Sequence, residues 1–280
     1  KKVIRVNYQG DIGPHVAKCL WGYLNFKEKE PLEHKGIWLG KIYSKASKKI
    51  KNNEKLQEEV KELNTKIYNH QGEIESLWEK TKQWCLDDFE DFYKEFGVEY
   101  ERLYFESEAA PIGEKVFQRL LKDKIANQSD GAVIVDLKKF NLDVYVGITS
   151  RGTPTYQVKD LGLAELKQKE FKFDKSLHVV GAEQSLYFKQ VFKTFELMDS
   201  PLAKKSKHIA YGLVMLPEGK MSSREGTMVL YHDLFTKLLE LSEKETKKRH
   251  PHLSPEEIKE RAKLISFGAL KFSMLSRENN

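Results

Sequence analysis

The chain has 280 residues, with 48 Lys and Arg residues against 42 Asp and Glu residues, and a formal net charge of +6. Hydrophobic residues make up 40% of it and aromatic residues 11%. This composition excludes a disordered protein and is sufficient for one large core, or for one core with an insertion. No stretch approaches the about 18 apolar residues of a membrane span, and the Lys-Lys start lacks the apolar run of a signal peptide. We therefore expect a cytoplasmic protein without a membrane partner.

Two cysteines, Cys19 and Cys85, lie far apart, without a CxxC pair or a histidine at metal-ligand spacing. This pattern supports neither a disulfide framework nor a zinc site, and both side chains are expected to be core thiols. The pI of about 8.9 is mild, and interspersed charges usually indicate a solvated surface, although a basic face would suit nucleic acid. Because the chain starts at Lys1 and runs directly into a strand-like segment, we expect it to be part of something longer.

The first hundred residues predict a strand, a turn and several turns of helix. Residues 3–8 alternate and are β-branched, a GDIGP turn follows, and residues 15–26 have helical spacing. Residues 44–96 are rich in Lys and Glu, with apolar residues at helical spacing and a break at residues 70–72. This pattern predicts a helical hairpin. Its polar faces fit either a solvated coiled arm or a surface that contacts RNA.

From residue 101 onward, predicted strands and helices alternate along the chain. The strands are expected at residues 103–105, 131–136, 142–148, 177–180 and 209–215, and the helices at 113–127, 155–169, 185–198, 231–242 and 256–276. This alternation is typical of an α/β fold with a doubly wound, mostly parallel Rossmann-type sheet. Ligands of such sheets bind at the carboxyl ends of the strands.

A loop with the sequence GKMSSREGT occupies residues 219–227, directly after a predicted strand. It places Lys220, Ser222, Ser223 and Arg224 between glycines. Cations on such a loop can close over a triphosphate and stabilise developing negative charge, while hydroxyls and backbone N–H groups contact the remaining oxygens. The alternative is an ordinary polar surface loop.

This loop resembles the KMSKS signature of class I aminoacyl-tRNA synthetases, and other blocks resemble the arginyl-tRNA synthetases in particular. The blocks are RVNYQGDIG and HVAK within residues 5–18, FESE at 105–108, PTYQVKDLG at 154–162 and VVGAEQ at 179–184. Four ordered blocks spread over nearly the whole chain are far more specific than one loop. The His-x-Gly-His signature of this class is absent, and in the family it lies just upstream of the segment that begins here.

The resemblance implies an arginine site formed by Tyr156, Asp160 and Gln184. Tyr156 and Asp160 are four residues apart on a predicted helix, so that a phenol and a carboxylate share one face. A guanidinium presents five donors in a fixed fork, which a carboxylate matches best. The alternatives are an ordinary hydrogen-bonded surface pair and, for Gln184, a residue of the turn that caps the next helix.

The resemblance also implies an ATP site. The VVG of residues 179–181 is a predicted buried strand that runs into a helix N-terminus, where free N–H groups favour nucleotides. Gly181 and Glu183 would handle the ATP ribose, and the backbone of Val214 and Met215 would read the adenine. A glycine after a strand is otherwise simply a turn residue, and apolar side chains in a strand are otherwise core.

Two further residues, Asn7 and Asp11, are candidate neighbours of the site, because the family has a similar Gly-Asp turn. An Asp beside a Gly is also a common turn sequence. The catalytic residues implied by the resemblance are those of the loop: Lys220, Ser222, Ser223 and Arg224.

One of these residues departs from the family pattern. Ser223 occupies the fourth KMSKS position, where most of the class has a lysine that stabilises pyrophosphate. Lys220, Arg224 or an upstream cation must then supply the charge, and we rank Lys220 above Ser223 for its effect on activity. The resemblance further implies ATP with Mg²⁺ as a substrate complex, with no protein-bound metal. The expected reaction activates L-arginine to arginyl-adenylate and transfers the arginyl group to the 3′ end of tRNA(Arg).

The predicted organisation has four parts: residues 1–24 in a Rossmann-type catalytic domain, 25–125 as a helical insertion, 126–255 as the second half of the catalytic domain, and 256–280 as the start of a C-terminal helical module. The expected partners are tRNA(Arg), L-arginine and ATP, the full-length protein is expected to be a monomer, and this stretch alone is expected to be inactive. One alternative is a class I synthetase for another amino acid, although a carboxylate at Asp160 would repel a glutamate side chain. The other is a non-catalytic, synthetase-like module that binds RNA or protein.

Overall fold

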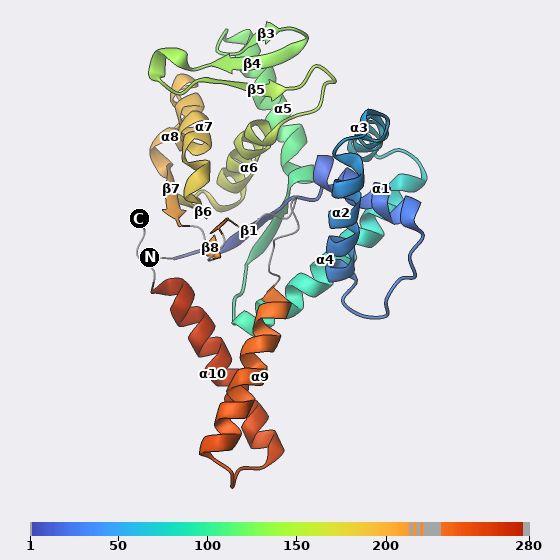
Figure 1. Ribbon diagram of the computed structural model, residues 1–280. Helices are drawn as coiled ribbons and strands as arrows, with labels where there is room; N and C mark the ends of the chain where they lie inside the picture. Colours follow the sequence, from blue (N-terminus) through green and yellow to red (C-terminus); the bar gives the residue numbers. More distant parts are fainter. Residues whose placement is uncertain (1, 213–214, 217–218, 221–230, 277–280) are drawn as a thin grey trace. The chain divides into compact units, whose positions relative to one another are not determined.

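The computed structural model of the protein describes residues 2–212, 215–216, 219–220 and 231–276 (Figure 1). The chain divides into two compact units, Lys1–Ile209 and Ala210–Asn280. Helices and short strands alternate in the first unit, so the α/β class is confirmed. The finer domain limits of residues 1–24, 25–125, 126–255 and 256–280 stay a prediction.

The first unit begins with the strand, turn and helix expected from the sequence. Strand β1 (Val6–Gln9) leads into α1 (Pro14–Phe26), which has a proline in its first turn, where a missing N–H costs no helical hydrogen bond. Strand β2 (Arg102–Phe105) lies parallel to β1, with Tyr8 opposite Tyr104. The pairing brings together two segments of the chain that α1 and the following helices separate in sequence.

Those following helices are α2 (Lys35–Ile50), α3 (Glu54–Tyr68) and α4 (Glu73–Phe96). The predicted break at residues 70–72 lies between α3 and α4. A second break, missed from the sequence, separates α2 from α3, because the side chain of Asn53 caps α3 by accepting a hydrogen bond from the Leu56 N–H at 3.1 Å. Helices α1 to α4 and the turn before α1 share one apolar core. Its largest members are Leu20, Trp21, Ile50, Ile67 and Trp78.

Helices α5 (Glu106–Lys122) and α6 (Tyr156–Phe171) pack with their backbones close together. A Cβ atom on Gly113 of α5 would meet the carbonyl group of Val158, and one on Gly162 of α6 would meet the carbonyl oxygen of Ala109. The two glycines therefore set how closely these helices approach. Helix α5 begins seven residues before the predicted start at residue 113 and tolerates Pro111 in its interior.

A three-stranded antiparallel sheet joins these helices in the first unit. It contains β3 (Asn127–Ser129), β4 (Ala132–Asp136) and β5 (Val144–Ile148) in that order. The predicted pairing of the second and third of these strands is confirmed. Their direction is antiparallel because only a short connection with the 3-10 helix η1 (Lys138–Phe140) links them, and a parallel crossover needs many more residues.

One core lies between this sheet and the helices on one of its faces (Figure 1). Its buried side chains come from β4, β5, α5, α6 and α7 (Ser185–Leu197). They include Phe117, Val135, Tyr145, Leu161 and Phe195.

The first unit ends with a strand-helix-strand segment. Strand β6 (Ser176–Gly181) continues through η2 (Ala182–Gln184) into α7, and a short helix α8 (Leu202–Lys205) precedes β7 (Ser206–Tyr211), the neighbour of β6. The strand predicted at 209–215 therefore lies at 206–211: it begins three residues earlier, and residue 212 is already outside it. The predicted strand and helix at 177–198 are confirmed.

In the second unit, β8 (Met215–Leu216) and β9 (Gly219–Lys220) pair antiparallel. Helices α9 (Tyr231–Arg249) and α10 (Pro255–Leu275) contact each other through rings such as Phe235 and Phe267, whose centroids are 4.4 Å apart. Helix α9 runs seven residues beyond its predicted end. None of the helices in the described part of the chain has the length and apolar character needed to cross a membrane.

Candidate functional site

Asp160 on α6 is a half-buried carboxylate whose Oδ2 accepts a hydrogen bond from the hydroxyl of Tyr187 on α7. Burial raises the pKa of Asp160 to about 6, although the hydrogen bond from Tyr187 and the charges of Lys167 and Lys159 lower it. The ion pairs found among the described residues do not include Asp160. Within the described part of the chain, Asp160 is therefore a carboxylate with a neutral donor beside it and no cation in direct contact.

The residue next to Asp160 forms a buried ion pair with the first residue of α5. Lys159 Nζ lies 2.5 Å from Glu106 Oε2, and the two side chains are only 3% and 8% exposed. Burial raises the pKa of Glu106, and the nearby charge of Lys159 opposes that rise. Lys159 therefore balances the charge of Glu106, and the charges that remain near Asp160 are its own carboxylate and the ammonium of Lys167.

Tyr156, the first residue of α6, lies on the open side of the same helical turn. Its side chain is 47% exposed, and Lys159 Nζ is 5.0 Å from its ring centroid. The structure thus places Tyr156 and Asp160 one turn apart, as expected. The hydroxyl that contacts Asp160 belongs to Tyr187, which the sequence analysis did not single out.

Gln184, Glu183 and Gly181 lie where β6 leads into α7. Gln184 is exposed at the N-cap position of α7, and its side chain makes no capping hydrogen bond. A Cβ atom on Gly181 would meet the exposed carboxylate of Glu183, so the glycine leaves room for that side chain to fold back over the strand end. Tyr187 follows Gln184 by three residues, which connects this turn to Asp160.

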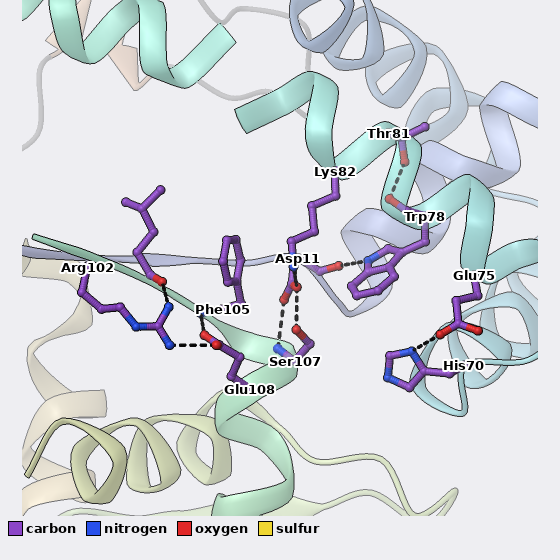
Figure 2. Close-up of polar contacts among 11 residues, drawn as sticks. Asp11, His70, Glu75, Trp78, Thr81, Lys82, Arg102, Phe105, Ser107 and Glu108 are labelled. Atoms are coloured by element: carbon purple, nitrogen blue, oxygen red, sulfur yellow. Dashed lines mark hydrogen bonds and ion pairs between the residues drawn. The ribbon is translucent and has the colours of Figure 1, made fainter. Parts of the chain in front are cut away.

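Asp11 accepts hydrogen bonds through both its carboxylate and its backbone carbonyl, and these bonds join three parts of the chain (Figure 2). Its carboxylate accepts hydrogen bonds from Lys82 Nζ at 2.6 Å, Ser107 Oγ at 2.6 Å and the Ser107 N–H at 2.9 Å. Its carbonyl oxygen accepts one from Trp78 Nε1 at 2.6 Å. Asp11 therefore ties the turn after β1 to α4 and α5, and it adjoins the site through Ser107, the residue after Glu106.

Asn7 also serves to hold elements together. Its Nδ2 donates to the hydroxyl of Tyr93 on α4 at 2.7 Å, and Gln9 Nε2 donates to the same hydroxyl at 3.0 Å. The Asn7 Oδ1 accepts from the N–H of Tyr8 at 2.8 Å. These bonds fasten β1, and with it Tyr8, to the end of α4.

The remaining predicted residues belong to the second unit. Val214, Ser222, Ser223 and Arg224 lie outside the described residues. Met215 and Lys220 are opposite each other in the β8–β9 pair. Their roles stay predictions. Among the residues that the structure describes, no group of three or more His, Cys, Asp or Glu residues is placed to hold a metal ion.

Four side chains around Asp160 were not predicted as site residues from the sequence: Glu106, Lys159, Lys167 and Tyr187. Two of them, Glu106 and Lys159, lie within the quoted blocks FESE and PTYQVKDLG. Lys167 lies two helical turns after Asp160, and its Nζ donates to Ser176 Oγ at 2.8 Å. Burial lowers the pKa of Lys167 to about 8. Helical spacing could have indicated two of them. Lys167 is seven residues after Asp160, and Tyr187 is three residues after Gln184.

The chain matches the model of one protein family along its length. The model of the class I (R) tRNA synthetase catalytic domain matches residues 1–280. The chain belongs to this family. The match includes the ordered sequence blocks around Asp160 and Gly181.

The chain is also similar to named relatives of this synthetase family. The chain is 34% identical over 280 residues to the arginine–tRNA ligase of Clostridium perfringens, covering 99% of this chain and 49% of that protein. It is 32% identical over 289 residues to the arginine–tRNA ligase of Bdellovibrio bacteriovorus, covering 100% of this chain and 50% of that protein. The chain thus spans about half the length of these curated relatives.

A solved structure supports the fold of this class I synthetase family member. The arginyl-tRNA synthetase of Plasmodium falciparum matches with a TM-score of 0.74 at 18% identity, over 99% of this chain and 46% of that one. This similarity is consistent with the expected Rossmann-type class I fold.

Proposed function

We propose that this chain is the part of an arginine–tRNA ligase that binds L-arginine and ATP and forms arginyl-adenylate. The observation that carries the proposal is Asp160, a half-buried carboxylate without a cationic partner among the described residues. An ionised carboxylate in a water-poor site is unfavourable unless a cation pairs with it. A guanidinium would supply both that charge and donors arranged to match the carboxylate.

The neighbours of Asp160 favour a cationic ligand and a fixed orientation. Tyr187 donates to one carboxylate oxygen and thereby leaves the other for the ligand. The pair of Lys159 and Glu106 is neutral overall, and Lys167 acts on Asp160 without an ion pair to it, so the Asp160 carboxylate is the acceptor that remains for a cationic ligand. Tyr156 and Gln184 are the exposed members of the predicted arginine site and would contact the part of the substrate nearer to solvent.

The ATP half of the proposal rests on the turn after β6. Gly181 and Glu183 would contact the ribose, and the backbone of Val214 and Met215 would read the adenine. Mg²⁺ would arrive with the triphosphate as part of the substrate. Lys220 and Arg224, with the hydroxyls of Ser222 and Ser223, would stabilise the pyrophosphate as it leaves.

The reaction needs little side-chain chemistry. The carboxylate of arginine attacks the α-phosphorus of ATP, which yields arginyl-adenylate and pyrophosphate, and a terminal ribose hydroxyl of tRNA(Arg) then takes the arginyl group. Positioning and electrostatic stabilisation supply most of the rate enhancement in such a reaction. We further propose that the full-length protein is a monomer and acts in the cytoplasm.

Exchange of pyrophosphate into ATP by the full-length protein tests this function. The assay would use each of the twenty amino acids, with total tRNA present and absent. Exchange that depends on arginine alone supports the proposal. Exchange with another amino acid would keep the reaction and reassign the site around Asp160, whereas no exchange with any of them, from a folded protein, would favour a non-catalytic RNA- or protein-binding role.

The variant Asp160→Asn adds a test of the site itself. It keeps the size of the side chain and removes the charge. We expect the KM for arginine to rise by about 100-fold, because a charged hydrogen bond is lost, while the KM for ATP changes little. Equal loss for both substrates would contradict the assignment of Asp160 to the guanidinium.

A further inference from the structure

Tyr8 on β1 has a buried hydroxyl that lacks a hydrogen-bond partner within the described part of the chain. Its ring packs against Tyr104, Ala109 and Leu163, which belong to β2, α5 and α6. The ring position is thus fixed by the elements that also carry Glu106 and Asp160. A buried polar atom without a partner is rare in folded proteins and calls for an explanation.

Other buried tyrosine hydroxyls of the same unit are paired. Tyr104, the register neighbour of Tyr8, donates to Glu170 at 2.5 Å, and Tyr145 shares a hydrogen bond with Thr194 at 2.8 Å. Tyr187 donates to Asp160. The fold therefore provides hydrogen-bond partners for these other buried tyrosine hydroxyls, and Tyr8 differs from them.

Tyr8 packs against Ala109 and Leu163, which follow Glu106 and Asp160 by three residues on α5 and α6, so it lies in the region of the candidate arginine site. After burial, the negative charges of Asp160, Glu106 and Asp11 and the nearby phenol of Tyr68 raise the pKa of Tyr8, and Tyr8 contributes in turn to the raised pKa of Tyr187. The hydroxyl thus stays protonated and neutral. Its neighbours Asp160 and Glu106 each have another partner already.

We propose that the Tyr8 hydroxyl is a further specificity-determining group of the arginine site and accepts a hydrogen bond from an N–H of the bound guanidinium. The inference rests on the function proposed above. A guanidinium has five N–H donors, more than one carboxylate can accept, and a buried neutral oxygen on a side chain that packs against α5 and α6 provides an additional acceptor. The missing partner of Tyr8 is then the ligand.

The test uses the variant Tyr8→Phe of the full-length protein in pyrophosphate exchange. Phenylalanine keeps the packing against Tyr104 and Leu163 and removes only the oxygen. We expect the KM for arginine to rise by about tenfold, with kcat and the KM for ATP unchanged. Thermal unfolding without ligand should be unchanged or occur at a higher temperature, because a buried unsatisfied hydroxyl is removed.

Tyr104→Phe is the matched control, since Tyr104 faces Tyr8 across the strand pair and its hydroxyl is already satisfied by Glu170. This variant should unfold at a lower temperature and keep the wild-type KM for arginine. An unchanged arginine KM in Tyr8→Phe, or a loss of stability with equal effects on both substrates, would overturn the proposal for Tyr8 alone. If the unsubstituted protein does not exchange with arginine, the proposed function fails and the role of Tyr8 fails with it.

Discussion

Asp11 caps the N-terminus of α5 from a segment 96 positions away in sequence, by accepting a hydrogen bond from the Ser107 N–H at 2.9 Å. The residue at the N-cap position itself is Phe105, which has no side-chain oxygen. Asp11 therefore satisfies a donor that the local sequence leaves free. The same carboxylate pairs with Lys82 of α4 (Figure 2). One side chain thus fixes the start of α5, whose first residue is Glu106.

Replacing Asp11 with alanine should destabilise the protein by about 3 kcal/mol, because it removes the cap of α5 and leaves the mostly buried Lys82 ammonium unpaired. Urea unfolding followed by circular dichroism measures the effect. Lys80→Met is the control on the same helix, since its pair with Glu30 is largely exposed and should contribute little. Similar midpoints for the two variants would contradict the role given to Asp11.

The buried pair of Glu106 and Lys159 should behave as one unit. Either Glu106→Gln or Lys159→Met should destabilise the protein by about 3 to 5 kcal/mol, because the remaining charge is buried without its partner. The double variant should be much less destabilised than the sum of the single ones. Additive effects in a double-mutant cycle of unfolding free energies would mean that the two side chains do not depend on each other.

Arginine binding should weaken below about pH 6, because only ionised Asp160 pairs with the guanidinium and the pKa of free Asp160 is raised to about 6. Affinity should fall about tenfold between about pH 7 and pH 5, with proton release on binding near the midpoint. Calorimetric titrations in buffers of different ionisation enthalpy measure both quantities. A flat profile for the unsubstituted protein would contradict the assignment, and Asp160→Asn should give a flat profile.

The stability of the unliganded protein should show the opposite dependence. The folded-state pKa of Asp160 lies above the value of 3.8 for a free aspartate, so folded protein holds this proton more tightly than unfolded protein. The contribution of Asp160 to stability is therefore full below about pH 4 and is lost as the pH rises through about 6. Tyr187→Phe removes a hydrogen bond that lowers the pKa of Asp160, and it should shift both midpoints to higher pH.

The glycines between α5 and α6 should be intolerant of side chains. Gly162→Ala should destabilise by about 1 to 3 kcal/mol or more, because its Cβ would meet the backbone of Ala109 and Gly113. Gly40→Ala on α2 is the matched control: nothing lies within 4 Å of the added atom, and alanine should stabilise this helix by about 0.5 to 1 kcal/mol. Thermal melts of both variants test this difference. A melting temperature for Gly162→Ala above that of Gly40→Ala would contradict the prediction.

Much of the fold could be predicted from local pattern. Alternation and helical spacing located α1, α6, α7 and α10 to within about two residues, because their apolar faces and end signals lie within each segment. The start of α5 was misplaced because Pro111 and Gly113 argue locally against a helix, while the cap supplied by Asp11 comes from a distant segment. The break between α2 and α3, by contrast, has a local signal in the sequence, the N-cap residue Asn53.

The sequence by itself determined the family and the α/β class and pointed to Asp160 as a candidate site residue, because ordered blocks and a carboxylate at helical spacing from Tyr156 are properties of the chain as written. Only the tertiary structure decided what surrounds Asp160. Tyr187 is 27 positions away, and the pair of Lys159 and Glu106 joins residues 53 positions apart. Burial raises the pKa of Asp160 and leaves the Tyr8 hydroxyl without a partner among the residues that the structure describes. It arises from packing between elements and is not visible in the local sequence.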